Sequence, residues 1–137
     1  MIEPVATPGP DDRDAILLIL AAHNASAAPP IDARDIAFYA TGDDGRRVGG
    51  LWGRIAYRWL FVQYLALEPM ARGNGLGTGL MRAAVDEAMA AGCVGVWLDT
   101  FSFQARGFYE RLGFTVFGQI DDYPPGDTRF FMVRRFG

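Results

Sequence analysis

The chain has 137 residues, of which 50% are hydrophobic, and a formal net charge of −3. This length suits one domain with a hydrophobic core, so we expect a single domain over residues 1–137. The acidic balance and the scattered arginines argue against nucleic acid, and no apolar run reaches the roughly 18 residues that cross a membrane. A single cysteine excludes an internal disulfide, and no secretory signal is visible, so we expect a cytoplasmic protein.

The first quarter of the chain predicts one helix and a loop. Val5 and its neighbours are compatible with a short first strand. After a break rich in proline and glycine, Asp11 or Asp12 is placed to cap a helix that runs to about Ala25. The adjacent prolines Pro29 and Pro30 forbid helix, so a loop is expected there.

The next segment is rich in β-branched and aromatic residues and has turn residues at regular intervals. It predicts three consecutive antiparallel strands over about 35–41, 46–56 and 60–67. The middle strand contains Gly49, Gly50 and Gly53, which indicates bulges or close packing.

A glycine-rich loop then leads into a helix that is expected to end near Ala91, before Gly92. A short buried strand over 94–100 follows. We predict a further helix from Ser102, its cap, to the stop at Gly113. Two final strands, over 114–120 and 128–136, complete a mixed sheet with helices packed on it.

The loop reads Arg72-Gly73-Asn74-Gly75-Leu76-Gly77-Thr78. A dinucleotide fingerprint does not fit, because no glycine stands at the sixth position from Gly73 or Gly75. A P-loop needs a lysine, and this chain has none. The remaining arrangement is R-x-x-G-x-G, in which free N–H groups at a helix start can grip a pyrophosphate. The alternative is a tight turn whose glycines serve packing alone.

The loop, together with "FQARGFYERLGF" about thirty residues later, resembles the GCN5-related N-acetyltransferase (GNAT) superfamily, and in particular its small single-domain bacterial members. The resemblance extends along nearly the whole chain. It implies an α/β (α+β) fold with a mixed, mostly antiparallel sheet of about six to seven strands and helices on both faces. It also implies an acetyl-CoA-dependent N-acetyltransferase that moves an acetyl group to an amine of a small molecule or protein by direct transfer in a ternary complex.

The resemblance implies a site for coenzyme A. The loop would hold the pyrophosphate, and the strand before it would hold the pantetheine arm and present the Leu67 N–H to the thioester carbonyl. Ser102 stands where many members have asparagine, and Gln104 is its substitute. The expected cofactor-binding residues are Leu65, Ala66, Leu67, Arg72, Gly73, Asn74, Gly75, Leu76, Gly77, Thr78, Ser102, Gln104 and Phe108.

Tyr109 occupies the family position whose hydroxyl protonates the departing thiolate, although its spacing alone would also suit a packing aromatic. Some group or a water chain must accept the amine's proton; Glu68 is the candidate base, with Asp99 and Asp122 as alternatives. The acceptor pocket is expected to involve Trp52, Tyr64, Asp99 and Asp122. No cluster has metal-ligand spacing, so no metal is expected.

Other functions remain open at this point. The same fold could be a non-catalytic acyl-CoA-binding regulatory module, which would keep the loop but would not need Tyr109. A different acyl donor or an oxygen acceptor is a third interpretation. We expect neither nucleic acid nor membrane as a partner, and we expect a homodimer that uses an exposed final strand.

Overall fold

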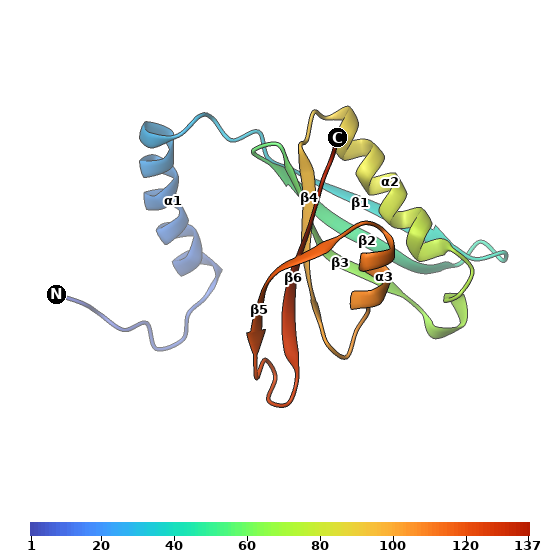
Figure 1. The fold of residues 1–137 in the computed structure, drawn as a ribbon. Helices are drawn as coiled ribbons and strands as arrows, with labels where there is room; N and C mark the ends of the chain where they lie inside the picture. Colours follow the sequence, from blue (N-terminus) through green and yellow to red (C-terminus); the bar gives the residue numbers. More distant parts are fainter. The chain divides into compact units, whose positions relative to one another are not determined.

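The computed structural model describes all residues, 1–137, which form two compact units, Met1–Ile31 and Asp32–Gly137 (Figure 1). The smaller unit contains the helix α1 (Pro10–Ala27). The two units are described separately below, and the expected single domain stays a prediction. None of the helices combines the length and apolar character that a membrane crossing requires.

The start of α1 differs from the predicted one. The N-cap is Gly9, and Pro10 occupies the first helical position. Proline loses no hydrogen bond there, because the first N–H groups of a helix have no partner within the helix. Asp12 lies inside the first turn and accepts a hydrogen bond of 2.8 Å from the Gly9 N–H. The expected strand at Val5 does not form. Residues 1–31 contain no strand with which an extended segment at Val5 could pair.

The larger unit contains six strands, two α-helices and one short 3₁₀ helix, in an order that matches the predicted one. The elements are β1 (Arg34–Thr41), β2 (Arg47–Ala56), β3 (Trp59–Leu67), η1 (Pro69–Ala71), α2 (Leu76–Ala90), β4 (Gly95–Phe101), α3 (Arg106–Arg111), β5 (Thr115–Asp121) and β6 (Thr128–Arg135).

The six strands form one mixed, mostly antiparallel sheet in the order β1-β2-β3-β4-β6-β5, as expected. Only β3 and β4 pair in parallel. The last strand, β6, pairs with both β4 and β5, so it is not the exposed strand that we expected. The free edge at that end belongs to β5, and the homodimer stays a prediction.

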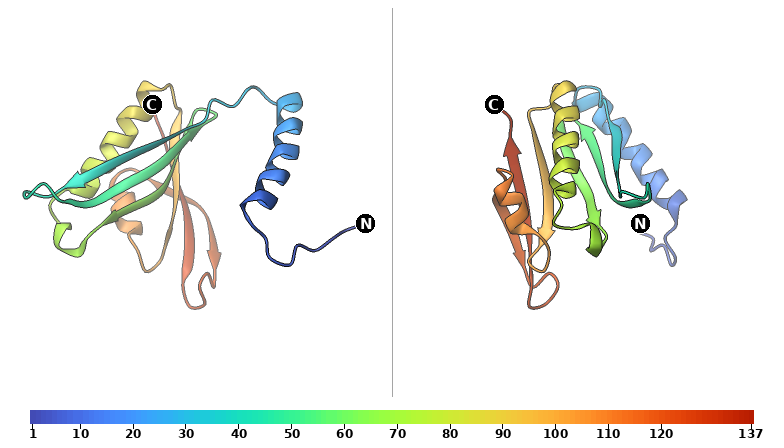
Figure 2. Two further views of the ribbon diagram at one scale, coloured as in Figure 1. Left: turned by 180° about the vertical axis from the view of Figure 1, so that it is seen from behind. Right: turned by 90° about the vertical axis from the view of Figure 1, so that its right-hand side faces the viewer.

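Helices α2 and α3 lie on the same face of the sheet (Figure 2). The core between them and the strands includes Leu60, Val96, Leu98 and Met132, each 1% exposed or less. Ala84 and Ala88 of α2 are fully buried, and such small side chains let the helix approach the strands closely. The opposite face, where we also expected a helix, carries none within residues 32–137.

The glycines of β2 confirm the expected close packing. A Cβ at Gly50 would lie 2.7 Å from the Phe38 carbonyl oxygen, and one at Gly53 would lie 2.9 Å from that of Phe61. Real side chains are essentially never that close to backbone. Cys93, the single cysteine, is buried in the core.

Replacing Leu60 by alanine should strongly destabilise the chain. Leu60 is 0% exposed at the centre of the sheet, and such truncations typically cost about 2–5 kcal/mol. Urea denaturation should show this loss, whereas Phe117→Ala, at a side chain 60% exposed, should change stability by about 0.5 kcal/mol or less. Equal effects of the two changes would contradict the assignment of the core.

Candidate active site

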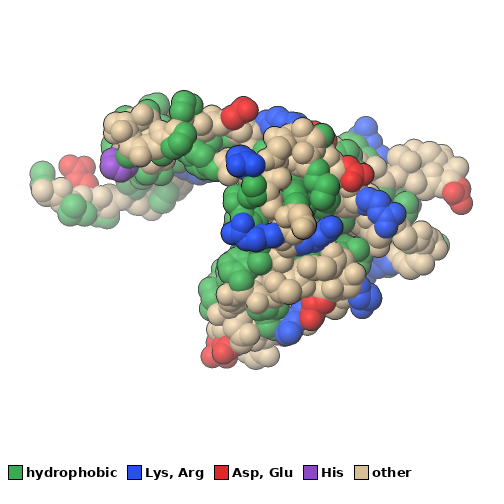
Figure 3. Space-filling view, turned by 45° about the horizontal axis from the view of Figure 1, so that its top comes forward, with side chains coloured by type: hydrophobic (Ala, Val, Ile, Leu, Met, Phe, Trp, Pro, Cys, Tyr) green, Lys and Arg blue, Asp and Glu red, His purple; other side chains and the backbone are tan.

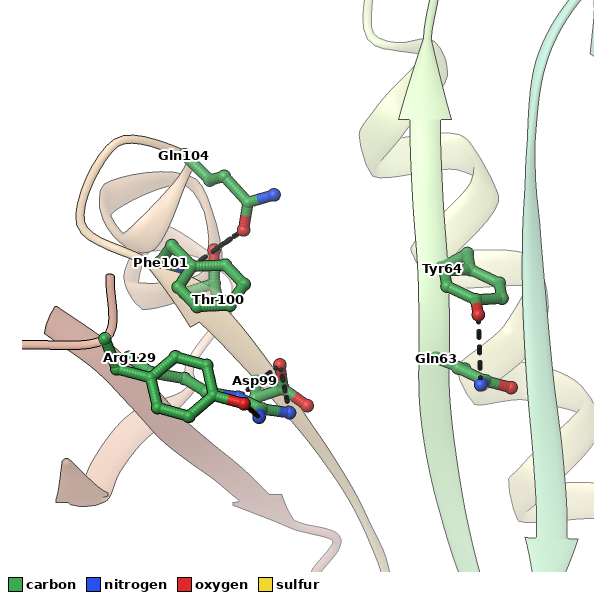
Figure 4. Close-up of polar contacts among 8 residues, drawn as sticks. Gln63, Tyr64, Asp99, Thr100, Phe101, Gln104 and Arg129 are labelled. Atoms are coloured by element: carbon green, nitrogen blue, oxygen red, sulfur yellow. Dashed lines mark hydrogen bonds and ion pairs between the residues drawn. The ribbon is translucent and has the colours of Figure 1, made fainter. Parts of the chain in front are cut away.

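The main cleft begins where two neighbouring strands part. β3 and β4 pair only from Trp59 to Val62 with Gly95 to Leu98. Beyond this point β3 remains paired with β2, while β4 remains paired with β6 as far as Phe101. The register between β2 and β3 shifts so that Gln63 has no partner, which is a β-bulge. Figure 4 shows Gln63 and Tyr64 on one strand and Asp99 and Thr100 on the other, across the opening.

The opening contains a cleft of about 900 Å³. Most of the predicted site residues lie along it, although they come from β3, the glycine loop, β4 and α3. They are Tyr64, Leu65, Ala66, Leu67, Arg72, Gly73, Gly75, Gly77, Thr78, Asp99, Gln104, Phe108 and Tyr109. The cleft therefore brings together segments that are about forty residues apart in the sequence.

Other predicted residues do not line this cleft: Trp52, Glu68, Asn74, Leu76, Ser102 and Asp122. The cleft also has lining residues that the sequence reasoning missed, namely Val62, Gln63, Thr100, Phe103, Ala105 and Arg111. Residues next to them in the sequence were predicted. These residues were missed because the separation of β3 from β4, which exposes them, has no signal in the local sequence. Arg111 alone, two residues after Tyr109, could have been found from its position in the motif.

The backbone of β3 offers unpaired groups to the cleft. The Glu68 N–H donates to the Val48 carbonyl oxygen at 2.8 Å. In an antiparallel ladder alternate residues bond to the partner strand, so Ala66 faces β2, whereas Leu65 and Leu67 direct their backbone groups towards the cleft. The Leu67 carbonyl accepts a hydrogen bond of 3.1 Å from the Arg72 guanidinium, which ties the glycine loop to the strand.

The glycine loop is shaped as an open cradle. Gly73 and Gly75 have φ of +81° and +80°, a left-handed conformation that side chains disfavour. A Cβ at either glycine would meet no atom within 4 Å, so both positions face open space. Gly75 is also the N-cap of α2, and no side chain caps the first N–H groups of that helix. Free N–H groups at the positive end of a helix dipole suit a pyrophosphate.

Tyr109 is held in one position by aromatic neighbours. Its ring meets those of Phe108 and Phe114 edge-on, with centroids 5.1 and 5.9 Å away. Burial, together with the negative charge of Asp99, raises the pKa of Tyr109 to about 12. The phenol is therefore protonated throughout the physiological range and can act as a hydrogen-bond donor in the cleft.

The segment before α3 differs from the prediction. The helix starts at Arg106 after Ala105, so Ser102 is not its cap. Ser102 instead donates to the Asp127 carboxylate at 2.7 Å and accepts from the Thr128 N–H at 3.0 Å, which ties this segment to the β5–β6 turn. Gln104 has a different role. Its side-chain oxygen accepts from the Phe101 N–H at 2.9 Å, and its amide nitrogen points away from that contact (Figure 4).

Asp99 is fixed at the cleft by an arginine. The Arg129 guanidinium donates a hydrogen bond from Nε to one oxygen of Asp99 at 3.1 Å, and its Nη2 forms an ion pair with the same oxygen at 3.0 Å. Its Nη1 donates to the Tyr123 hydroxyl at 3.2 Å. The guanidinium also lies within 5.6 Å of the ring centroids of Phe101, Tyr123 and Phe131. The ion pair raises the pKa of Arg129, chiefly through the hydrogen bond to Asp99.

Two predicted carboxylates lie elsewhere. Glu68 accepts two hydrogen bonds of 2.8 Å from Arg46, and this pairing lowers its pKa. Glu68 also lies outside the lining of the cleft, and its role as the base stays a prediction. Asp122 is exposed in the turn between β5 and β6, with φ of +57°. No group of three or more His, Cys, Asp and Glu side chains is placed to hold a metal ion.

The parted strands and the open glycine cradle together offer backbone hydrogen-bonding groups that suit an extended ligand with a phosphate group. The model of the Acetyltransferase (GNAT) family matches residues 12–114. The chain is also 41% identical over 110 residues to the blasticidin-S acetyltransferase of Streptomyces morookaense, covering 77% of this chain and 81% of that protein.

Solved structures have the same fold. The crystal structure of a candidate acetyltransferase from Agrobacterium tumefaciens is 32% identical, covers 99% of both chains and gives a TM-score of 0.91. A candidate streptothricin acetyltransferase from Bacillus anthracis, solved with acetyl coenzyme A, is 18% identical, covers 75% of this chain and 63% of that one, and gives a TM-score of 0.68. The chain belongs to the GNAT acetyltransferase family, whose members use acetyl-CoA.

Removing the Asp99 charge should lower the pKa of Tyr109. In Asp99→Asn the Coulombic contribution disappears and only burial remains, so the pKa should fall below about 12. Titration of ¹³C-labelled tyrosine by NMR would measure the change. Asp122→Asn removes the same charge from an exposed turn outside the cleft and should leave the Tyr109 titration unaltered. An unchanged pKa in Asp99→Asn would contradict the described geometry.

Proposed function

We propose that the cleft binds acetyl-CoA and transfers its acetyl group directly to an amine in a ternary complex. The observation that carries the proposal is that residues from both faces of the sheet line one cleft. Gly75 and Tyr109 belong to the side covered by helices, whereas Asp99 alternates with the buried Leu98 and Thr100 and so belongs to the opposite side. Two substrates could therefore meet in the opening from opposite directions.

The described residues suit coenzyme A along its length. The loop from Gly73 to Thr78 would bind the pyrophosphate through N–H groups. The unpaired backbone of Leu65 would pair with the pantetheine arm. The Leu67 N–H would donate to the thioester carbonyl oxygen, where negative charge develops during attack; such donors can contribute about 3–4 kcal/mol in the transition state.

Tyr109 would stabilise the leaving sulfur. The new bond joins the amine nitrogen to the acetyl carbon, while the carbon–sulfur bond breaks and leaves a thiolate. A phenol of pKa about 12 holds its proton more tightly than a thiol, for which the pKa is about 8.5. Full proton transfer from Tyr109 is therefore unfavourable, and a hydrogen bond to the thiolate is the role that fits. The amine nitrogen loses one proton and the thiolate takes up one proton to become the thiol product, so the reaction balances.

The acceptor that fits best is a cationic amine of a small antibiotic. Asp99 presents a carboxylate to the cleft with one oxygen paired to Arg129, and Tyr64 lines the same cleft. An alkylammonium must lose a proton before attack, and Asp99 is the carboxylate that the cleft offers for it. The names of two similar proteins, a blasticidin-S acetyltransferase and a candidate streptothricin acetyltransferase, support this acceptor class.

Ligand-induced thermal stabilisation tests the cofactor. Acetyl-CoA and coenzyme A at about a hundred times their dissociation constant should add roughly 2.7 kcal/mol to the folded state, whereas NAD should add nothing. Gly75→Glu should abolish the shift, because a carboxylate would occupy the cradle. Gly45→Glu is the matched control: Gly45 also has a positive φ, of +78°, and open space around it, but it lies in the β1–β2 turn. The absence of a shift in the unmodified protein would refute acetyl-CoA binding.

Tyr109→Phe separates catalysis from binding. A hydrogen bond to a charged group is worth about 1.5–3 kcal/mol, so kcat with blasticidin S as acceptor should fall about 10- to 100-fold, with little change in the affinity for coenzyme A. Steady-state kinetics and calorimetry would measure the two quantities. Binding of acetyl-CoA without turnover of blasticidin S, streptothricin or an amine panel would instead favour the regulatory acyl-CoA-binding module.

A further inference from the structure

Three aromatic side chains form a stack beside the main cleft. The Phe101 ring is the middle member: its centroid lies 5.2 Å from that of Phe103, with 6° between the ring planes, and 5.8 Å from that of Tyr123, with 25° between the planes. We call these three side chains the aromatic stack. Phe103 lines the cleft and is 60% exposed, so the stack offers an exposed ring to the opening.

The aromatic stack begins on the same face of the sheet as Asp99. Phe101 follows Asp99 by two positions on β4, and alternate residues of a strand share a face. At about 3.3 Å per residue, the two positions are about 7 Å apart along the strand. Arg129 engages only one carboxylate oxygen of Asp99, so the other oxygen is free to accept a hydrogen bond from a ligand. The opening therefore combines a hydrogen-bond acceptor for an amine with a row of rings a short distance away.

A hydrogen-bonded turn holds Phe103 in place. The Gln104 N–H donates to the Phe101 carbonyl oxygen at 2.9 Å, and the Gln104 side-chain oxygen accepts from the Phe101 N–H at 2.9 Å (Figure 4). Ser102, inside the turn, donates to the Asp127 carboxylate at 2.7 Å. The Phe103 ring is therefore carried by backbone that is fixed without a ligand. Such preorganisation lowers the entropy cost of binding.

An arginine contacts the other two members of the aromatic stack. Because the chain has no lysine, every blue side chain in Figure 3 is an arginine, and several lie beside hydrophobic side chains. The Arg129 guanidinium lies 5.6 and 5.2 Å from the ring centroids of Phe101 and Tyr123, within the range of a cation–π attraction. No guanidinium lies over the Phe103 ring. Phe103 is thus the member of the stack that is available to a ligand.

The chemistry of an exposed ring beside a carboxylate favours one kind of ligand. Aromatic rings attract other flat rings in offset-stacked or edge-on arrangements, beyond the effect of burying apolar area. Exposed apolar patches with a polar rim are typical of ligand-binding surfaces, and here the rim includes Asp99 and Arg129. A ligand that has an amine at one end and a flat ring at the other would contact both the free oxygen of Asp99 and the ring of Phe103.

From this geometry we propose that the aromatic stack makes the protein selective for amine acceptors that carry a flat, conjugated ring a few bonds from the amine. The proposal rests on the proposed function, and it narrows the acceptor class of the same cleft. The ring of the acceptor stacks on Phe103, while its amine donates a hydrogen bond to the free carboxylate oxygen of Asp99. A saturated ring of the same size is puckered and has no π face, so it gains no stacking there.

Titration of the protein in the presence of coenzyme A with two matched amines tests the proposal. The probes are 3-phenylpropylamine and 3-cyclohexylpropylamine, which share the ammonium group and the spacer but differ in the ring. NMR of ¹³C-labelled phenylalanine would give both dissociation constants. The phenyl amine should bind about 2- to 10-fold more tightly, which is the range that aromatic pairs contribute. Burial of apolar area alone would favour the cyclohexyl amine instead.

Three variants assign the preference to a particular ring. Phe103→Leu removes the π face and should abolish the preference for the phenyl amine, whereas Phe103→Tyr keeps a flat ring and should retain it. Phe117→Leu is the matched control, because Phe117 is also 60% exposed but lies outside the cleft, and it should retain the full preference. The exposure of both positions means that none of these changes removes a core side chain.

The outcomes separate this proposal from the proposed function. Coenzyme A is titrated first, and if it does not bind to the unmodified protein, the proposed function fails and the selectivity proposal fails with it. If coenzyme A binds but the two amines bind equally, or neither binds, the aromatic stack does not select the acceptor, although the cofactor site stands. A preference that persists in Phe103→Leu would overturn the assignment to the stack in the same way.

Discussion

The site depends on the parting of β3 and β4, the only parallel pair in the sheet. β6 keeps β4 in the sheet beyond Leu98, and β2 does the same for β3 beyond Val62, so both strands continue without each other. The bulge at Gln63 changes the direction of β3 at the point where the pairing stops. The unsatisfied backbone groups that result would be costly in a closed core. Facing a cleft, they become the means by which an extended ligand can be bound.

The electrostatics of the cleft follow from how each ionisable group is paired. Asp99 is anchored to Arg129, and its charge in turn makes the Tyr109 phenol harder to ionise. The cleft thus combines a carboxylate held by an arginine with a phenol that keeps its proton. Glu68 is also paired with an arginine, Arg46, but it lies outside the lining of the cleft. Because both carboxylates are paired with an arginine, it is the position of Asp99 in the lining of the cleft that distinguishes it from Glu68.

Much of the fold was predictable because its signals are local. The alternation of apolar residues and the turns in residues 35–67 predicted three strands to within a residue or two at either end. Gly92 and Gly113 indicated the ends of two helices, and both have a positive φ in the structure. The glycine loop and Tyr109 were found from the motif. What failed depends on partners far away in the sequence. Ser102, the expected cap of the helix α3, instead donates a hydrogen bond to Asp127, 25 residues later in the chain.

The absence of lysine has a consequence for chemistry with amines. All the positive side chains along the cleft are guanidinium groups, which stay charged at any pH that the protein survives. Alkaline conditions, which convert more of an alkylammonium into the reactive free amine, would leave the attraction for phosphate intact. The chain also has no side-chain amine of its own. A protein built to acetylate amines therefore offers no side-chain nitrogen of that kind as a competing acceptor.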